Sequence, residues 1–300
     1  MRPLRALLIY LAVVFLGGAL LAPWLWQLAQ TGAQHFPSLQ NTAAQPFHRY
    51  LHRALLALAL LGLWPLVRQL GLRHRRDLGL VRFSGNGKNL LTGLTLGFGS
   101  LALVIGFALF GHAREFSHDL TAALLAKAFF KAATTAAVVA LLEEILFRGG
   151  VFGGLRRVLN WQFALGLSSG VFALVHFFQR AELVGAVNWS AGLRLLPAML
   201  AGFLDVQKLL PGFGNLALVG ALLALAYQRS GNLWLGIGLH AGWIFWLKFS
   251  AVVTPVVPGA RVWFWGSSQL IDGWLTLGAL LLVLALSGKL FPAQIKTSRR

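Results

Sequence analysis

The chain contains no cysteine and few acidic residues: 8 Asp and Glu stand against 26 Lys and Arg in 300 residues. Without cysteine there is no disulfide bond, no thiol nucleophile and no cysteine-ligated metal centre. Charged residues make up only 11% of the sequence and hydrophobic residues 57%, whereas soluble domains are roughly 25% charged. A soluble core could not cover this much apolar surface, so lipid must be the solvent for much of the chain.

The formal net charge is +18, which in a soluble protein would suggest a nucleic-acid partner. Here the cations lie in short segments between apolar runs, where Lys and Arg mark the cytoplasmic loops of membrane proteins. This distribution favours an integral membrane protein whose partner is the lipid bilayer, and it argues against nucleic acid.

Eight apolar runs have the composition of membrane-spanning helices. They cover about residues 6–28, 51–70, 90–110, 132–155, 161–178, 213–227, 233–249 and 271–286. The sequence therefore predicts an all-α, polytopic transmembrane bundle of about eight spans. The first run is too long for the apolar region of a typical signal peptide, which favours an uncleaved span.

Two further stretches are ambiguous. The mixed stretch from His112 to Lys131 is expected to lie along the membrane interface. If Leu193–Leu210 does not cross the membrane, every basic cluster falls on the cytoplasmic side, including both ends of the chain. We therefore expect an interfacial or re-entrant segment there, with both termini cytoplasmic, in a bacterial inner membrane.

Glu143 and Glu144 are adjacent within an apolar run, Ala140-Leu-Leu-Glu-Glu-Ile-Leu-Phe-Arg148. A charge at bilayer depth costs at least about 2.5–3.5 kcal/mol, so such groups face a protein interior or a water cavity and are functional by default. Glu144 and Arg148 are four residues apart and share a helix face, in the favourable order. Glu143 is offset by about 100°. We interpret Glu144 and Arg148 as a structural pair and Glu143 as a candidate general base.

His176 and His240 lie in two other apolar runs, and Phe172 precedes His176 by one helical turn. A lone His on an apolar helix is more often a packed, hydrogen-bonded residue than a catalyst. Two at membrane depth, together with Glu143, favour a shared site. The zinc-protease pattern HExxH is absent from the sequence.

Three motifs in this order, Glu143-Glu-Ile-Leu-Phe-Arg148, Phe172-Ala-Leu-Val-His176 and the late His240, resemble those of the CPBP (CAAX protease and bacteriocin-processing, or Abi) family of intramembrane proteases. That family includes the type II CAAX prenyl endopeptidases. The motifs cover roughly a third of the chain. One position departs from the pattern, because Ile244 stands where the family usually has Asn or Asp. Trp243 or Asn232 could supply a replacement donor, activity could be reduced, or the protein could bind without cutting.

The resemblance implies hydrolysis of a peptide bond in a membrane-associated protein or peptide. Glu143 would activate a water, and His176 and His240 would orient that water or stabilise the oxyanion. Glu144, Arg148 and Phe172 would support the site. The family has been described both as metalloproteases and as glutamic proteases. Glu143, His176 and His240 could ligate zinc, but we expect no metal cofactor.

The resemblance also suggests three parts: residues 1–120, N-terminal transmembrane helices of unassigned role; 121–250, a protease-like transmembrane core; and 251–300, an aromatic loop, the last span and a basic tail. Two alternatives stay open. A transporter or proton relay would equally bury Glu, Arg and His, although the sequence has no internal repeat of spans. A non-catalytic immunity or scaffold member of the same family would fit Ile244.

Overall fold

The computed structural model describes residues 2–178, 181–205 and 209–291. In this part of the chain the secondary structure is helical, apart from one isolated antiparallel bridge between Arg114 and Val256. The all-α class predicted from the sequence is confirmed. The end of the basic tail, residues 292–300, lies outside the described residues.

Within the described residues, six helical stretches are long and apolar enough to cross a membrane. They are Leu4–His35, Phe47–Gln69, Gly87–Phe110, Ala122–Leu155, Leu209–Ser230 and Trp234–Val253. The other two expected spans form shorter helices, Trp161–His176 with 16 residues and Trp274–Leu290 with 17. The ambiguous segment forms a short apolar helix, Ala191–Leu204, and its non-crossing placement stays a prediction.

The chain divides into two compact units. Unit 1 comprises Met1–Leu72 with Phe177–Asp205, and unit 2 comprises Arg73–His176 with Val206–Arg300. In unit 1, α2 packs against α4 and α9 around a core that includes Ala19, Leu51 and Leu195. The helices of unit 1 are α1 (Arg2–Ala12), η1 (Val13–Gly17), α2 (Gly18–His35), η2 (Pro37–Leu39), α3 (Gln40–Ala43), α4 (Phe47–Gln69), α9 (Ala191–Met199) and η4 (Ala201–Leu204).

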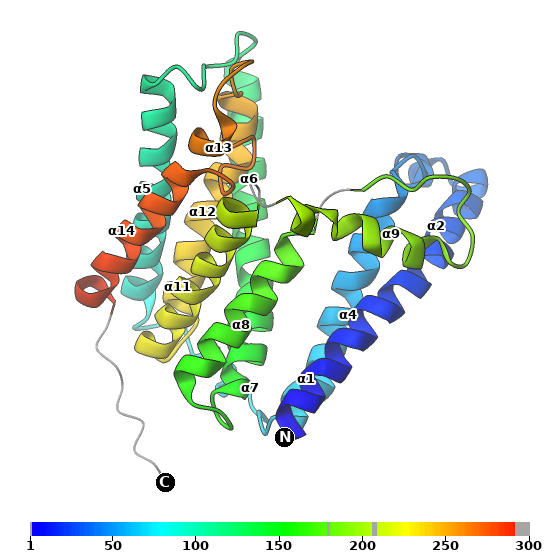
Figure 1. Cartoon of the computed structure of the whole chain (residues 1–300), viewed down its shortest axis with the longest axis horizontal. Helices are drawn as coiled ribbons and strands as arrows, with labels where there is room; N and C mark the ends of the chain where they lie inside the picture. The colour runs from blue at the N-terminus through cyan, green and yellow to red at the C-terminus, as the bar shows by residue number, and fades with distance from the viewer. Residues whose placement is uncertain (1, 179–180, 206–208, 292–300) are drawn as a thin grey trace. The chain divides into compact units, whose positions relative to one another are not determined.

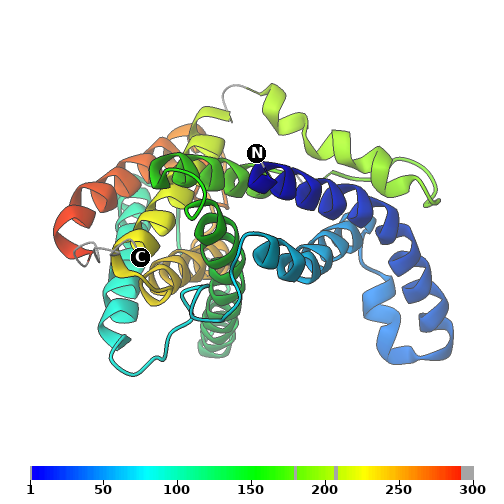
Figure 2. The same ribbon diagram turned by 90° about the horizontal axis from the view of Figure 1, so that it is seen from below.

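Unit 2 contains all the candidate site residues. Its helices are α5 (Gly87–Phe110), α6 (Ala122–Glu143), η3 (Glu144–Phe152), α7 (Gly153–Leu155), α8 (Trp161–His176), η5 (Leu209–Phe213), α11 (Gly214–Ser230), α12 (Trp234–Val253), α13 (Val262–Trp265) and α14 (Trp274–Leu290). Helices α5, α12, α11 and α8 lie side by side (Figure 1). The end-on view shows α12 between α5 and α6 (Figure 2).

Glycine brings α5 and α12 into backbone contact. A Cβ at Gly93 or Gly97 of α5 would lie 2.1 Å from the carbonyl oxygen of Leu235 or Leu239 of α12, respectively. The relation is reciprocal, because a Cβ at Gly238 of α12 would lie 2.1 Å from the carbonyl oxygen of Leu90. Small residues spaced by four let membrane helices approach in this way. Helix α12, which carries His240, thus packs on α5 with main chain against main chain.

The second half of the stretch from His112 to Lys131 forms the beginning of a long helix, and its expected placement at the membrane interface stays a prediction. Helix α6 begins at Ala122, where Thr121 Oγ1 accepts a hydrogen bond from Leu124 N at 3.1 Å. The continuous stretch from there to Leu155 has 34 residues, or about 51 Å at 1.5 Å per residue. Because a hydrocarbon core is only about 30 Å thick, the helix projects beyond it. Lysines in its first turns are compatible with such a length, because those turns need not lie in the hydrocarbon core.

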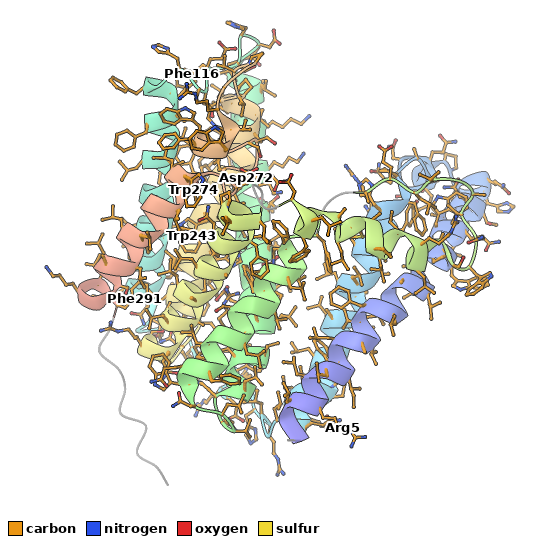
Figure 3. All side chains as sticks on the ribbon, viewed as in Figure 1. Arg5, Phe116, Trp243, Asp272, Trp274 and Phe291 are labelled. Carbon is orange, nitrogen blue, oxygen red and sulfur yellow. The ribbon has the colours of Figure 1, made fainter. Side chains whose placement is uncertain are left out.

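The loops at the far end of unit 2 are tied together by Arg114, which is 2% exposed. Its guanidinium donates to the carbonyl oxygens of Thr254 and Ser267. Asp272 accepts a hydrogen bond from Ser267 N at 2.8 Å, and it lies beside Trp274 at the start of α14 (Figure 3). These bonds order the aromatic loop that the sequence placed before the last span.

Candidate active site

A row of alanines guides the end of α6 toward α12. Ala128, Ala132, Ala136 and Ala140 recur every four residues and are all buried. Side chains this small allow close helix packing, and α6 packs along α12. The next member of the four-residue series is Glu144, so its carboxylate faces α12.

From Glu144 to Phe152 the helix is π-helical, with hydrogen bonds to the fifth residue along instead of the fourth. π-Helical turns occur frequently at functional sites. Gly149 lets the neighbouring loop approach this segment closely, because a Cβ there would lie 2.7 Å from the Leu78 carbonyl oxygen.

The deepest group of ionisable residues is Glu144, Arg148 and His240. Arg148 Nη1 lies 3.1 Å from Glu144 Oε1, as the sequence predicted, and the two side chains are 1% and 0% exposed. His240 Nδ1 lies 3.0 Å from the same oxygen, an interaction that the sequence did not predict. Gly236 leaves the room for this carboxylate, since a Cβ there would lie 2.7 Å from Glu144 Oε2. Glu144 therefore links the buried cation to a histidine on another helix.

This contact determines which nitrogen of His240 carries the proton. Glu144 is paired with Arg148, so its carboxylate is ionised and only accepts hydrogen bonds. His240 must then donate from Nδ1, which leaves its Nε2 lone pair free. That Nε2 lies 3.7 Å from Glu143 Oε2.

Glu143 and His176 form a more open group. His176 Nε2 lies 3.1 Å from Glu143 Oε2, and the side chains are 27% and 20% exposed. The other ring nitrogen of His176, Nδ1, is 2.9 Å from the Phe172 carbonyl oxygen, to which it can only donate. The structure thus brings Glu143, His176 and His240 together, with both Nε2 atoms directed at one carboxylate oxygen. Glu143 is accessible, whereas Glu144 is sealed in the interior.

Phe172 contacts both His176 and Arg148. Its ring stacks on the His176 imidazole, with centroids 4.1 Å apart. The Arg148 guanidinium also lies over the Phe172 ring, 4.4 Å from the ring centroid. Cation–π attraction of this kind stabilises a desolvated cation. The supporting role expected for Phe172 stays a prediction, and its contacts are compatible with it.

The residues proposed to replace the missing Asn are engaged elsewhere. Ile244 is buried on α12, 6% exposed. Trp243, which lies within unit 2 in Figure 3, donates from Nε1 to Ser100 Oγ of α5 at 2.9 Å. Asn232 Nδ2 donates to Asn86 Oδ1 and to the Ser230 carbonyl oxygen, each at 3.1 Å. Neither side chain is available as a substitute donor.

The donor set of Glu143, His176 and His240 suits zinc chemically, and both histidines have the outer hydrogen bonds typical of ligands. The spacing does not suit a metal, since the carboxylate oxygen and the imidazole nitrogen of His176 are within direct hydrogen-bonding distance. In the described part of the chain, no group of three or more His, Asp or Glu side chains is arranged to hold a metal ion. The expectation of a metal-free site stays a prediction.

Comparison with protein families gives one match over this region. Residues 125–246, from the start of α6 into α12, match the family described as type II CAAX prenyl endopeptidase Rce1-like. This segment of the chain belongs to the CAAX protease family. The match confirms the resemblance that the three motifs indicated. The matched segment contains every candidate site residue of this CAAX protease domain. The family is one of proteases, and with its apolar helices the chain is an integral membrane protein. Curated proteins and solved structures gave no match.

Proposed function

We propose that the protein is an intramembrane endopeptidase in which Glu143 activates a water and the two histidines complete the site. The convergence of His176 Nε2 and His240 Nε2 on Glu143 Oε2 carries this proposal. The substrate is a membrane-associated protein or peptide, because Glu143 and His240 lie on helices that are long and apolar enough to cross a membrane.

The charge count supports an ionised Glu143. Glu143 and Glu144 contribute two negative charges, and Arg148 contributes one positive charge. His176 Nδ1 donates to a backbone carbonyl, so its hydrogen bond to Glu143 requires a second proton on Nε2 or on the carboxyl group. If that proton is on His176, the four side chains of Glu143, Glu144, Arg148 and His176 together carry no net charge. Glu143 then remains a carboxylate that can accept a proton from water.

The reaction then follows from the positions of the donors and acceptors. Glu143 removes a proton from the water while the water oxygen attacks the carbon of the scissile carbonyl group. The displaced electron pair moves to the carbonyl oxygen, where the Nε2–H group of His176 donates a hydrogen bond. His240 Nε2 accepts the second hydrogen of the water and orients it. When the C–N bond breaks, Glu143 returns the proton to the departing amine.

The test compares membranes that contain the wild-type protein with membranes that contain Glu143→Gln. Labelling of new protein N-termini, followed by mass spectrometry, should detect cleavage products only with the wild type. Equal amounts of folded protein, checked by thermal unfolding, are the control. Products of the same sequence and abundance with both proteins would contradict the proposal.

A non-catalytic family member is the second candidate, and Ile244 favours it. The usual polar residue is missing, and the hydrogen bonds of Trp243 and Asn232 are already used. In that case the N-terminal labelling would find no product with either protein, although both would fold.

The proposed topology places both termini in the cytoplasm, so that the basic loops lie inside. A reporter protein fused to the C-terminus, active only in the cytoplasm, tests this arrangement. Activity of a periplasm-specific reporter at the same position would refute it.

A further inference from the structure

Positive charge accumulates at the end of unit 2 where α7 ends and α12 begins. Five basic residues of the segment before and at the start of α5 have exposed side chains: Arg73, Arg75, Arg76, Arg82 and Lys88. We call them the basic end face. Of the eight acidic residues of the chain, only Asp77 belongs to this segment. None of the ion pairs found among the described residues involves a member of the basic end face.

Asp77 shapes this surface without neutralising it. Its Oδ2 accepts hydrogen bonds from the backbone N–H groups of Arg73 and His74, each at 2.9 Å. Its Oδ1 pairs with Arg157 Nη2 at 2.9 Å. The backbone hydrogen bond from His74 is the main reason that the pKa of Asp77 is lowered from its usual value. The carboxylate is thus committed to holding the turn, and the side chains of Arg73, Arg75 and Arg76 remain available.

The turn is also anchored to the helices of unit 2. Leu233 N donates to the Gly79 carbonyl oxygen at 3.1 Å, and Trp234 Nε1 donates to the Val81 carbonyl oxygen at 3.2 Å. Gly79 has a φ of 77°, in the left-handed region that glycine adopts readily. The basic end face therefore has a fixed position relative to the first turn of α12.

Aromatic residues beside the basic end face indicate how deep it lies in the membrane. Phe83 and Trp234 pack edge to face, with ring centroids 5.1 Å apart, and Phe83 is 52% exposed. Trp at the end of a membrane-spanning helix typically lies at the headgroup level. Since Arg82 adjoins Phe83 and Trp234 opens α12, the arginines lie at the same level.

We propose that the basic end face binds the phosphate headgroups of anionic phospholipids in the surrounding membrane. Arginine forks match phosphate geometry, and clusters of basic residues next to membrane helices attract anionic lipid. Lipid fits better than an acidic protein segment, because the surface lies at headgroup depth, where the local concentration of lipid phosphate is highest. This binding is independent of peptide hydrolysis.

The experiment measures thermal unfolding of the full-length protein in a neutral detergent while phosphatidylglycerol or phosphatidylcholine is titrated. Wild type should be stabilised by phosphatidylglycerol alone. The triple variant Arg73→Gln, Arg75→Gln and Arg76→Gln should need on the order of 100-fold more phosphatidylglycerol, since each basic residue near a lipid surface contributes a factor of about 5. Its turn should stay intact, because Asp77 binds backbone groups there.

The matched control removes the same charge from exposed sites elsewhere: Arg49→Gln, Arg53→Gln and Arg261→Gln. It should keep the wild-type response to phosphatidylglycerol. A triple variant that responds like wild type would overturn the proposal. Equal stabilisation by soluble glycerol phosphate would also overturn it, and so would a response to polyglutamate but not to lipid. If the triple variant fails to fold, the pair Arg82→Gln and Lys88→Gln tests the same surface, with an expected weakening of about 25-fold.

Discussion

Replacing Glu144 by Gln should destabilise the protein, whereas replacing Glu143 by Gln should leave it folded and inactive. Arg148 is 1% exposed, and its only carboxylate within ion-pair distance among the described residues is Glu144. Removing one partner of a buried ion pair typically costs about 3–5 kcal/mol. Glu143 is partly accessible, and Gln can still form a hydrogen bond at its position, so the expected loss there is about 1 kcal/mol.

The measurement pairs thermal unfolding with cleavage for both variants. For a domain of 150–250 residues, 3–5 kcal/mol corresponds to about 6–20 °C in Tm, which Glu144→Gln should show. Glu143→Gln should unfold within a few degrees of wild type and release no product. If Glu143→Gln is the unstable variant and Glu144→Gln is stable but inactive, the assignment of the two glutamates is reversed.

A double variant separates the two roles of Glu144. Glu144→Gln combined with Arg148→Met removes both charges, and the large cost of breaking a buried pair comes from the uncompensated charge that is left behind. The double variant should therefore recover much of the lost Tm. Its activity should stay low, because His240 no longer donates to a carboxylate. Full recovery of cleavage would show that Glu144 serves only to neutralise Arg148.

Three further outcomes are expected. Purified protein should contain no stoichiometric zinc by elemental analysis; about one zinc per chain, lost in His176→Ala, would contradict the metal-free mechanism. Ile244→Asn should keep or raise the cleavage rate by returning the family's usual donor, and loss of activity would argue against the alignment of the third motif. Gly93→Ala should lower Tm and folded yield, because its Cβ would lie 2.1 Å from the Leu235 carbonyl oxygen. Gly99→Ala is the control and should lower neither, because a Cβ at Gly99 has open space around it. Equal Tm values for the two variants would refute the close packing of α5 and α12.

The main residues of the site could be predicted from the sequence because ionisable side chains are rare within apolar helices. Glu143, His176 and His240 each interrupt a long hydrophobic run, and a shared site explains all three. The pair of Glu144 and Arg148 was also predictable, because residues four apart on a helix are neighbours. These inferences need only local spacing and the cost of charge in lipid.

The contact between Glu144 and His240 could not be found in the same way, because 96 residues separate them. The alanine series that ends at Glu144 was a signal that was overlooked, since it marks the face of α6 that approaches another helix. The π-helical winding of η3 had no local signature in the sequence. The beginning of α6 was missed because two lysines interrupt its hydropathy, although a long helix can carry them beyond the membrane core.

The backbone contact between α5 and α12 has a mechanical consequence. Two helices whose carbonyl groups meet glycine Cα atoms cannot slide or separate without losing the contact altogether. The face of α12 that packs on α5 is therefore rigid. A peptide substrate must reach His240 past one of the other faces of α12. Because the chain has no cysteine of its own, a single engineered disulfide can fasten α5 to α12, and turnover should continue with the two helices locked together.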